Sequence, residues 1–352
     1  MPPKKKAAKK EHNGEAVAGE DPLQLLNNYQ KFCRLIGVPI NPKVVSQLQD
    51  QEHLPITQLV VDDEFGPLGP GGTRALTTSI LGTGQDMKGG PYKLLKGLRL
   101  WRVNCADEGT RSISEILRLG GGDIKLEYLE MLDCRVGGTG ALALGQALAA
   151  GCNRSLLSLK LDYNQTLGSE GARALCRGLR TNATLRQLHL PYCGVGGDAG
   201  AALGEMLSYS KLQLAVLNLQ GNRLGGEGLR DLAPGLARNG SVTYLSLADN
   251  AIGGVARDVE ALALFRDAIL ACTTLSHVDL LYNRIGPDGA TTLLPALAPD
   301  NAQIRQFLVD ATLPTPLFDA LHRRDAGAKK KGGGKKVRRT RQRSSYKFRL
   351  KM

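Results

Sequence analysis

Apolar residues recur along most of the chain in one spaced pattern, Leu-x-x-Leu-x-Leu-x-x-(Asn/Cys)-x-Leu. The clear copies begin at Leu126, Leu156, Leu185, Leu214, Val242 and Leu275, and weaker copies begin at Ile56, Leu95 and Ile304. From residue 98 to residue 307, the central apolar positions follow one another at steps of about 28 to 33 residues. Self-similarity at such a period predicts a solenoid of stacked repeats.

Within each copy, the spacing of apolar residues changes from the two-residue period of a strand to the 3.6-residue period of a helix. Apolar and polar residues alternate around the central leucine, which predicts a short strand. A glycine and a helical pattern follow the Asn or Cys, as with Ala172, Leu175 and Leu179 on one face. Each unit therefore predicts strand, turn, helix and turn, and the whole predicts an α/β solenoid of about eight to nine repeats.

Three features together resemble the ribonuclease-inhibitor type of leucine-rich repeat. They are the repeat length, the Gly-x-x-Gly helix starts and the alternation of Cys134, Asn164, Cys193 and Asn222. The resemblance covers roughly residues 56 to 312, and it implies a horseshoe with a parallel sheet on the concave side and helices on the convex side. Asn250 and Asn283 follow without an intervening Cys, which leaves the register there less certain.

Two helices are expected ahead of the repeats. Asp21 with Pro22 caps the first and Gly37 ends it, while Asn41 with Pro42 starts the second. They predict a helical cap over residues 21–55, before a repeat domain over residues 56–321. The helical cap is also loosely similar to the start of leucine-rich subunits of ciliary axonemes.

One part of the repeat domain is expected to be irregular. Residues 62–93 form an insertion rich in Gly and Pro, including Gly-Pro-Gly-Gly at 69–72. We expect a helix only near residues 74–81, between two loops.

Charge is distributed unevenly along the chain. The net charge is +13 overall, about +13 within residues 322–352 and about +3 within residues 1–19, which leaves about −3 for the rest. Both ends lack enough apolar residues to form a core, so we expect disordered basic tails over residues 1–20 and 322–352.

The C-terminal tail is a candidate polyanion-binding segment. Its candidate residues are Arg338, Arg339, Arg341, Arg343, Lys347, Arg349 and Lys351. The acidic surface of tubulin, RNA and an acidic protein groove are the alternatives for its partner. A solubilising or nuclear-import tail is a further alternative.

The candidate binding face follows from strand alternation. Side chains that point away from the leucine core are expected to line the groove. The candidates for partner binding are Trp101, Tyr128, Glu130, Asp133, Asp162, Tyr163, His189, Tyr192, Tyr244, Asp249, Asp279 and Tyr282. Aromatic anchors beside charges are typical of protein interfaces. We expect the groove to hold a basic protein segment, unless these side chains are only solvated or pair with one another.

Catalytic and metal-binding motifs are absent from the sequence. There is no GxSxG, HExxH or GxxxxGK[ST] and no cluster of Cys and His, so we expect no enzyme, metal, cofactor or small-molecule substrate. The seven cysteines carry no CxxC spacing and are expected to be reduced. No apolar run has the length of a membrane span or a secretory signal, which favours the cytoplasm, a cilium or the nucleus.

Three functional classes remain open. The first and favoured class is a structural scaffold in a multisubunit assembly, such as the axoneme or another microtubule-associated complex. The second is a ribonucleoprotein-associated factor whose basic tail contacts RNA. The third is a regulatory protein of the Ran GTPase-activator type, whose acidic tail is the reverse of the basic one here.

Overall fold

The computed structural model describes residues 18–50, 55–84, 86–120, 122–298 and 301–325. The strands of these residues form one parallel sheet in sequence order, from β1 to β9. They are β1 (Gln58–Asp62), β2 (Gly97–Trp101), β3 (Tyr128–Leu132), β4 (Ser158–Lys160), β5 (Gln187–His189), β6 (Val216–Asn218), β7 (Tyr244–Ser246), β8 (His277–Asp279) and β9 (Gln306–Leu308). The predicted α/β leucine-rich-repeat solenoid is confirmed.

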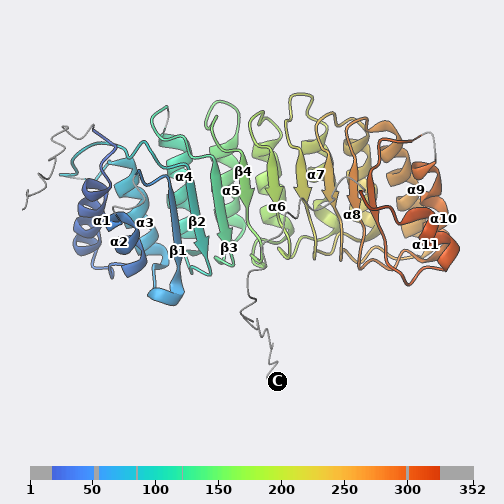
Figure 1. Ribbon diagram of the computed structural model, residues 1–352, viewed down its shortest axis with the longest axis horizontal. Coiled ribbons are helices and arrows are strands. Elements are labelled where there is room, and N and C mark those ends of the chain that lie inside the picture. The colour runs from blue at the N-terminus through green and yellow to red at the C-terminus, as the bar shows by residue number, and fades with distance from the viewer. Residues whose placement is uncertain (1–17, 51–54, 85, 121, 299–300, 326–352) are drawn as a thin grey trace, which may run out of the picture.

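The helices form a second layer on one face of the sheet (Figure 1). They are α3 (Gly69–Leu81), α4 (Ala106–Leu119), α5 (Gly138–Leu148), α6 (Gly168–Leu179), α7 (Gly200–Leu207), α8 (Gly225–Ala237), α9 (Ala256–Ala271) and α10 (Gly286–Leu293). Short 3-10 turns accompany them: η1 (Asp63–Phe65), η2 (Gly197–Ala199) and η3 (Leu294–Leu297). At the ends lie α1 (Pro22–Ile36), α2 (Pro42–Gln49) and α11 (Thr315–Leu321).

The hydrophobic core lies between the two layers and follows the repeat pattern. The central apolar residues pair from strand to strand in one unbroken row: Leu59, Leu98, Leu129, Leu159, Leu188, Leu217, Leu245, Val278 and Phe307. Every one of them is fully buried. Because strand residues alternate faces, the residues on either side of this row point to the open face of the sheet.

A ladder of asparagine side chains holds the turns after the strands. Asn222 accepts hydrogen bonds from the backbone N–H of Cys193 (3.1 Å) and of Val195 (3.0 Å). Its side-chain amide donates to the carbonyls of Leu190 and Leu219, both at 2.8 Å. One buried side chain thus satisfies four backbone groups that water cannot reach. Asn164 and Asn283 bind their turns in the same way.

The cysteines of the alternation occupy a different turn geometry, and Asn250 shares it. The Cys193 thiol donates to the carbonyls of Leu161 (3.0 Å) and Pro191 (3.5 Å). Asn250 donates to the corresponding carbonyls, those of Leu219 (2.8 Å) and Ala248 (3.0 Å). Asn250 therefore stands in a cysteine-type position, and the alternation of turn geometry continues where the alternation of residue types stops.

The two helices expected ahead of the repeats are α1 and α2. Asp21 accepts a hydrogen bond from the N–H of Leu23, and the left-handed Gly37 ends α1. Asn41 accepts from the N–H groups of Lys43 and Val44 at the start of α2.

The irregular insertion is more helical than its composition suggests. Helix α3 begins at Gly69, so the prediction that Gly-Pro-Gly-Gly forms a loop is wrong. Pro70 lies in the first turn, where a missing N–H costs nothing. A Cβ atom on Gly71 would lie 2.7 Å from Val38 Cγ1, so glycine permits the approach of α3 to the end of α1.

The C-terminal end of the sheet is closed by the chain itself. Phe307 and Arg323 exchange two backbone hydrogen bonds of 2.8 Å in an antiparallel bridge. The Arg323 guanidinium also donates to the carbonyls of Ile304 (2.8 Å) and Leu297 (3.1 Å). Residues 322–325 are therefore folded, and the predicted start of the tail at residue 322 is too early. The tail residues from 326 onward, and residues 1–17, lie outside the described residues.

Pairs of glycines bring neighbouring helices into backbone contact on the convex side. A Cβ atom on Gly178 in α6 would overlap the carbonyl oxygen of Gly145 in α5. Gly235 in α8 faces Gly204 in α7 in the same way. At these two crossings no side chain separates the helices.

The asparagine ladder generates a stability prediction with a matched control. Asn222→Ala leaves the buried N–H groups of Cys193 and Val195 without acceptors, so we expect the free energy of unfolding to fall by about 2–4 kcal/mol. Asn250→Cys introduces the residue type that the same turn geometry carries elsewhere. It loses only the long hydrogen bond from the Leu224 N–H (3.4 Å) and keeps a donor to the two carbonyls, so we expect a loss below about 1.5 kcal/mol. Urea denaturation followed by circular dichroism measures both. Equal losses would contradict the distinction between the two turn types.

Candidate functional site

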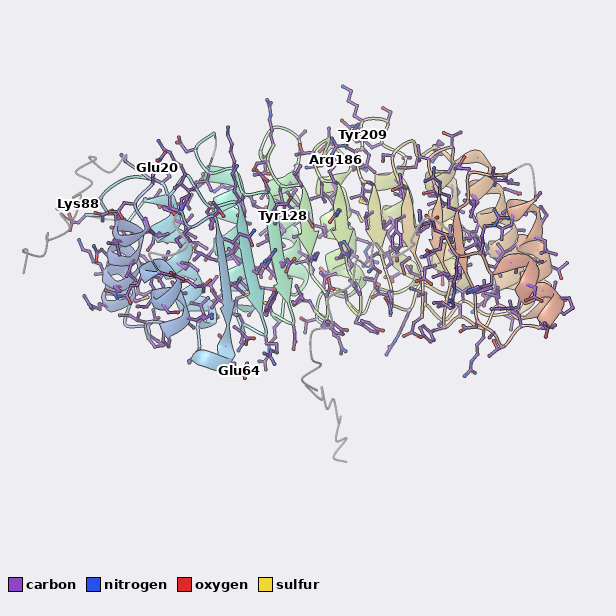
Figure 2. The ribbon with its side chains drawn as sticks, viewed as in Figure 1. Glu20, Glu64, Lys88, Tyr128, Arg186 and Tyr209 are labelled. Carbon is purple, nitrogen blue, oxygen red and sulfur yellow. The ribbon has the colours of Figure 1, made fainter. Side chains whose placement is uncertain are left out.

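The open face of the sheet carries a row of polar side chains in strand register. The row runs through Arg99, Glu130, Lys160, His189, Asn218, Ser246 and Asp279. Tyr128 lies beside this row, over the strands in the middle of the view in Figure 2. Glu64 lies at the edge where the strands end, and Arg186 and Tyr209 lie at the opposite edge (Figure 2). The row, the tyrosines beside it and the strand-end edge make up the candidate binding surface.

In the N-terminal half of the face, the acidic group is already paired. The Glu130 carboxylate lies 2.8 Å from Lys160 Nζ and 3.5 Å from Arg99 Nε, and Trp101 Nε1 donates to it at 3.4 Å. Burial opposes ionisation of this carboxyl, but the hydrogen bond and charge of Lys160 outweigh that cost, so the pKa of Glu130 lies below its ordinary value. Glu130 is therefore paired with two cations of the chain, as in the alternative that these side chains pair with one another, and its role in binding a partner stays a prediction.

The next rungs, Asp162 and His189, are half-buried. Burial raises the pKa of Asp162, although Lys160 partly offsets it. Burial and the Lys160 ammonium lower the pKa of His189, so its imidazole is neutral at neutral pH. At the centre of the face, burial therefore opposes the charged forms of both Asp162 and His189.

The C-terminal half of the face is acidic. Burial, and then the neighbouring Asp310 carboxylate, raise the pKa of Asp279. Burial, and then Asp279, raise the pKa of Tyr244. Within the described residues neither Asp279 nor Asp310 takes part in an ion pair, so a cationic side chain would relieve their repulsion.

At the edge where the strands end, a second row has a left-handed backbone. Its members are Arg102, Asp133, Tyr163, Tyr192, Gly221, Asp249 and Tyr282, with φ between 52° and 70°. We call this row the turn ridge. The rings of Tyr163 and Tyr192 are stacked, with centroids 5.0 Å apart and planes 5° apart. The Tyr192 ring covers Gly221, where any Cβ atom would overlap it.

A hollow of about 620 Å³ lies beside the turn ridge. Its lining includes Tyr192 and Tyr282, and its charged groups are those of Asp249, Arg223 and Arg284. We call it the ridge hollow.

The predicted binding residues divide into three groups. The first group lies in strands on the open face: Tyr128, Glu130, His189, Tyr244 and Asp279. The second lies at or just after strand ends: Trp101 and Asp162. The third lies on the turn ridge: Asp133, Tyr163, Tyr192, Asp249 and Tyr282. All of them are at least partly accessible. Their role in binding stays a prediction.

Sequence reasoning missed the two arginines of the ridge hollow. A signal was present, because Asn-Arg-Leu-Gly at 222–225 and Asn-Arg-Ile-Gly at 283–286 place an arginine directly after the turn asparagine. The strand alternation rule covers only residues of the strand and its immediate end, and these arginines follow it.

The described residues contain no group of His, Cys, Asp and Glu that could hold a metal ion. All seven cysteines are free, and only Cys152 is exposed. Among the described helices, none combines the length and apolar character that a bilayer crossing requires.

Comparison with known proteins identifies the repeats. The leucine-rich-repeat family matches residues 152–176, 181–204, 214–233 and 271–294. Ribonuclease inhibitor of Sus scrofa is 27% identical over 187 residues, which cover 53% of this chain and 39% of the relative. NACHT, LRR and PYD domains-containing protein 5 of Homo sapiens is 28% identical over 257 residues, covering 58% of this chain and 21% of the relative.

A third relative matches more of this chain. Capping protein, Arp2/3 and myosin-I linker protein 2 of Mus musculus is 32% identical over 296 residues, covering 81% of this chain and 21% of the relative. The chain thus spans only 21% to 39% of the length of these three relatives. The chain is a leucine-rich-repeat protein of the ribonuclease-inhibitor type.

Proposed function

We propose that the chain is a non-enzymatic scaffold that binds another protein through the open face of its sheet and the turn ridge. The observation that carries this proposal is the stacked pair Tyr163 and Tyr192, held on a left-handed backbone at an accessible edge. Tyrosine is enriched among the residues that dominate the energetics of protein interfaces. Tyr282, which is 67% exposed, extends the same surface.

The backbone of the turn ridge supports a binding role for its tyrosines. A left-handed conformation costs an ordinary L-residue roughly 1–2 kcal/mol, while glycine adopts it freely and Asp or Asn tolerate it better. Gly221, Asp133 and Asp249 are therefore the residues that folding favours at this position. Tyr163, Tyr192 and Tyr282 place bulky rings there instead, which is expected where function outweighs stability.

The relatives support the same class of function. One is named as an inhibitor of a ribonuclease, and another is named as a linker of capping protein, Arp2/3 and myosin-I. Both names describe proteins that act on or join other proteins. Leucine-rich repeats mediate protein–protein interaction, which supports a scaffold.

We further propose that the partner belongs to a multisubunit assembly of the axonemal or microtubule-associated kind, in the cytoplasm or a cilium. Residues 338–351 would then bind the acidic surface of tubulin. A ribonucleoprotein-associated factor, with the same residues on RNA and a place in the nucleus, remains the alternative for the tail. A regulatory protein of the Ran GTPase-activator type remains the alternative for the repeats.

Replacing Tyr163 and Tyr192 together with alanine should reduce partner binding at least about tenfold, because both rings lose their contact area. Crosslinking and co-purification from the native source, quantified by mass spectrometry, measure it. The control is the double variant Leu264→Ala and Leu270→Ala, which removes two exposed side chains (44% and 49%) from the convex helix α9. Equal capture by both variants would remove the turn ridge from the interface.

Tyr282→Asn should raise the free energy of unfolding by about 0.5–1 kcal/mol, because asparagine tolerates the left-handed backbone and an exposed ring loses little packing. Tyr282→Val should lower it instead, since a β-branched residue is strained there. Urea denaturation of the two variants provides the comparison. A destabilised Asn variant would show that the ring stabilises the fold and is not kept for binding alone.

Replacing Arg338, Arg339, Arg341 and Arg343 with alanine should strongly reduce sedimentation with microtubules at low salt, because the segment loses its positive charge. Sedimentation with and without competing RNA is the measurement. Binding to RNA with a steep salt dependence, and none to microtubules, would favour the ribonucleoprotein alternative.

A further inference from the structure

The ridge hollow contains more positive than negative charge. Arg223 and Arg284 contribute two cations, and Asp249 contributes one carboxylate. Both arginines are exposed. Within the described residues neither arginine takes part in an ion pair, and Asp249 takes part in none either. The positive charge of the hollow is therefore not compensated by the fold.

The repeat positions of the arginines set their separation. Arg223 follows the turn after β6, and Arg284 follows the turn after β8. Two strand spacings separate them, which is roughly 10 Å at the usual spacing of neighbouring strands. Ala251 occupies the equivalent position between them and also lines the hollow. Its small side chain occupies little of the space between these two repeat positions.

An aromatic wall accompanies the charges. Tyr192 is fixed on one side, because its ring stacks on Tyr163 and its hydroxyl accepts a hydrogen bond from Gln220 Nε2 at 3.3 Å. The O–H proton of Tyr192 makes no hydrogen bond among the described residues. Arginine and tyrosine are two of the three residue types enriched among the residues that dominate interface energetics.

We propose that the ridge hollow binds an acidic segment of the partner protein, with a carboxylate side chain between Arg223 and Arg284. Arginine presents a planar fork of donors that matches a carboxylate, and the tyrosine hydroxyl supplies another donor. Asp249 accepts from the backbone N–H groups of the same segment. This inference rests on the proposed function and specifies the chemistry of the partner at one end of that surface.

A basic segment fits the ridge hollow poorly. A lysine or arginine that approached Asp249 would also approach Arg223 and Arg284, and like charges placed together in an interface are strongly unfavourable. The acidic open face around Asp279 and Asp310 is the place for basic groups. A partner that covers both surfaces would therefore carry opposite charges on two adjacent parts.

The test uses the full chain and a defined probe, the peptide acetyl-Glu-Glu-Bpa-Glu-Glu-amide, in which Bpa is the photoreactive p-benzoylphenylalanine. The crosslinked sites are mapped by mass spectrometry, which separates the ridge hollow from the basic tail. We expect crosslinks near Tyr192, Arg223 and Tyr282. The double variant Arg223→Ala and Arg284→Ala should reduce them about tenfold, because two charge-assisted contacts are lost.

Two controls make the outcome decisive. Arg338→Ala with Arg339→Ala removes the same charge from the tail and should leave the crosslinks at the hollow unchanged. The corresponding peptide with lysine in place of glutamate should not crosslink there. The proposal is overturned if the acidic peptide reacts only with the tail, if the hollow variant reacts as the wild type does, or if the lysine peptide reacts equally. Partner capture that still depends on Tyr163 and Tyr192 would then leave the proposed function intact.

Discussion

Burial of backbone polar groups is the constraint on which the whole array depends. The turns after β3, β5 and β7 contain N–H groups that lie inside the stack, where water cannot satisfy them. Asn164, Asn222 and Asn283 each satisfy four backbone groups, and they reach into the turn of the preceding repeat to do so. The hydrogen bonds that close one turn therefore also join two repeats. Stacking and local folding depend on the same side chains.

Much of the fold could be predicted because its signal is periodic. Leucine spacing specified the strands, their order and their buried faces. The lapse in the Cys and Asn alternation was misleading at Asn250, because an amide N–H can replace a thiol as donor to the same two carbonyls. The start of α3 could not be read from composition either. Gly-Pro-Gly-Gly is typical of a loop, whereas in the fold Pro70 fits the first turn of α3 and Gly71 permits the close approach to Val38.

The candidate site was predicted in outline but not in its electrostatics. Strand alternation identifies which side chains reach the open face, but it does not show which of them pair. Glu130 is neutralised by Lys160 and Arg99 from neighbouring rungs, whereas Asp279 is left beside another carboxylate. Strand alternation could not identify Arg223 and Arg284, because both follow the turn after their strand. The charged residues that interact on this surface lie on neighbouring strands and are about 30 residues apart in the sequence. Their pairing therefore follows from the order of the strands and cannot be read from nearby residues in the sequence.

The glycine pairs on the convex side bear on the curvature of the array. A leucine-rich horseshoe bends because helices stand about 8–10 Å apart while strands stand about 4.8 Å apart. Where Gly145 meets Gly178, and where Gly204 meets Gly235, the helices touch through their backbones, and that difference shrinks. The arc should be flatter across α5–α6 and α7–α8. A flatter arc offers its open face to a broad, gently curved partner surface and is less suited to enclosing a narrow one.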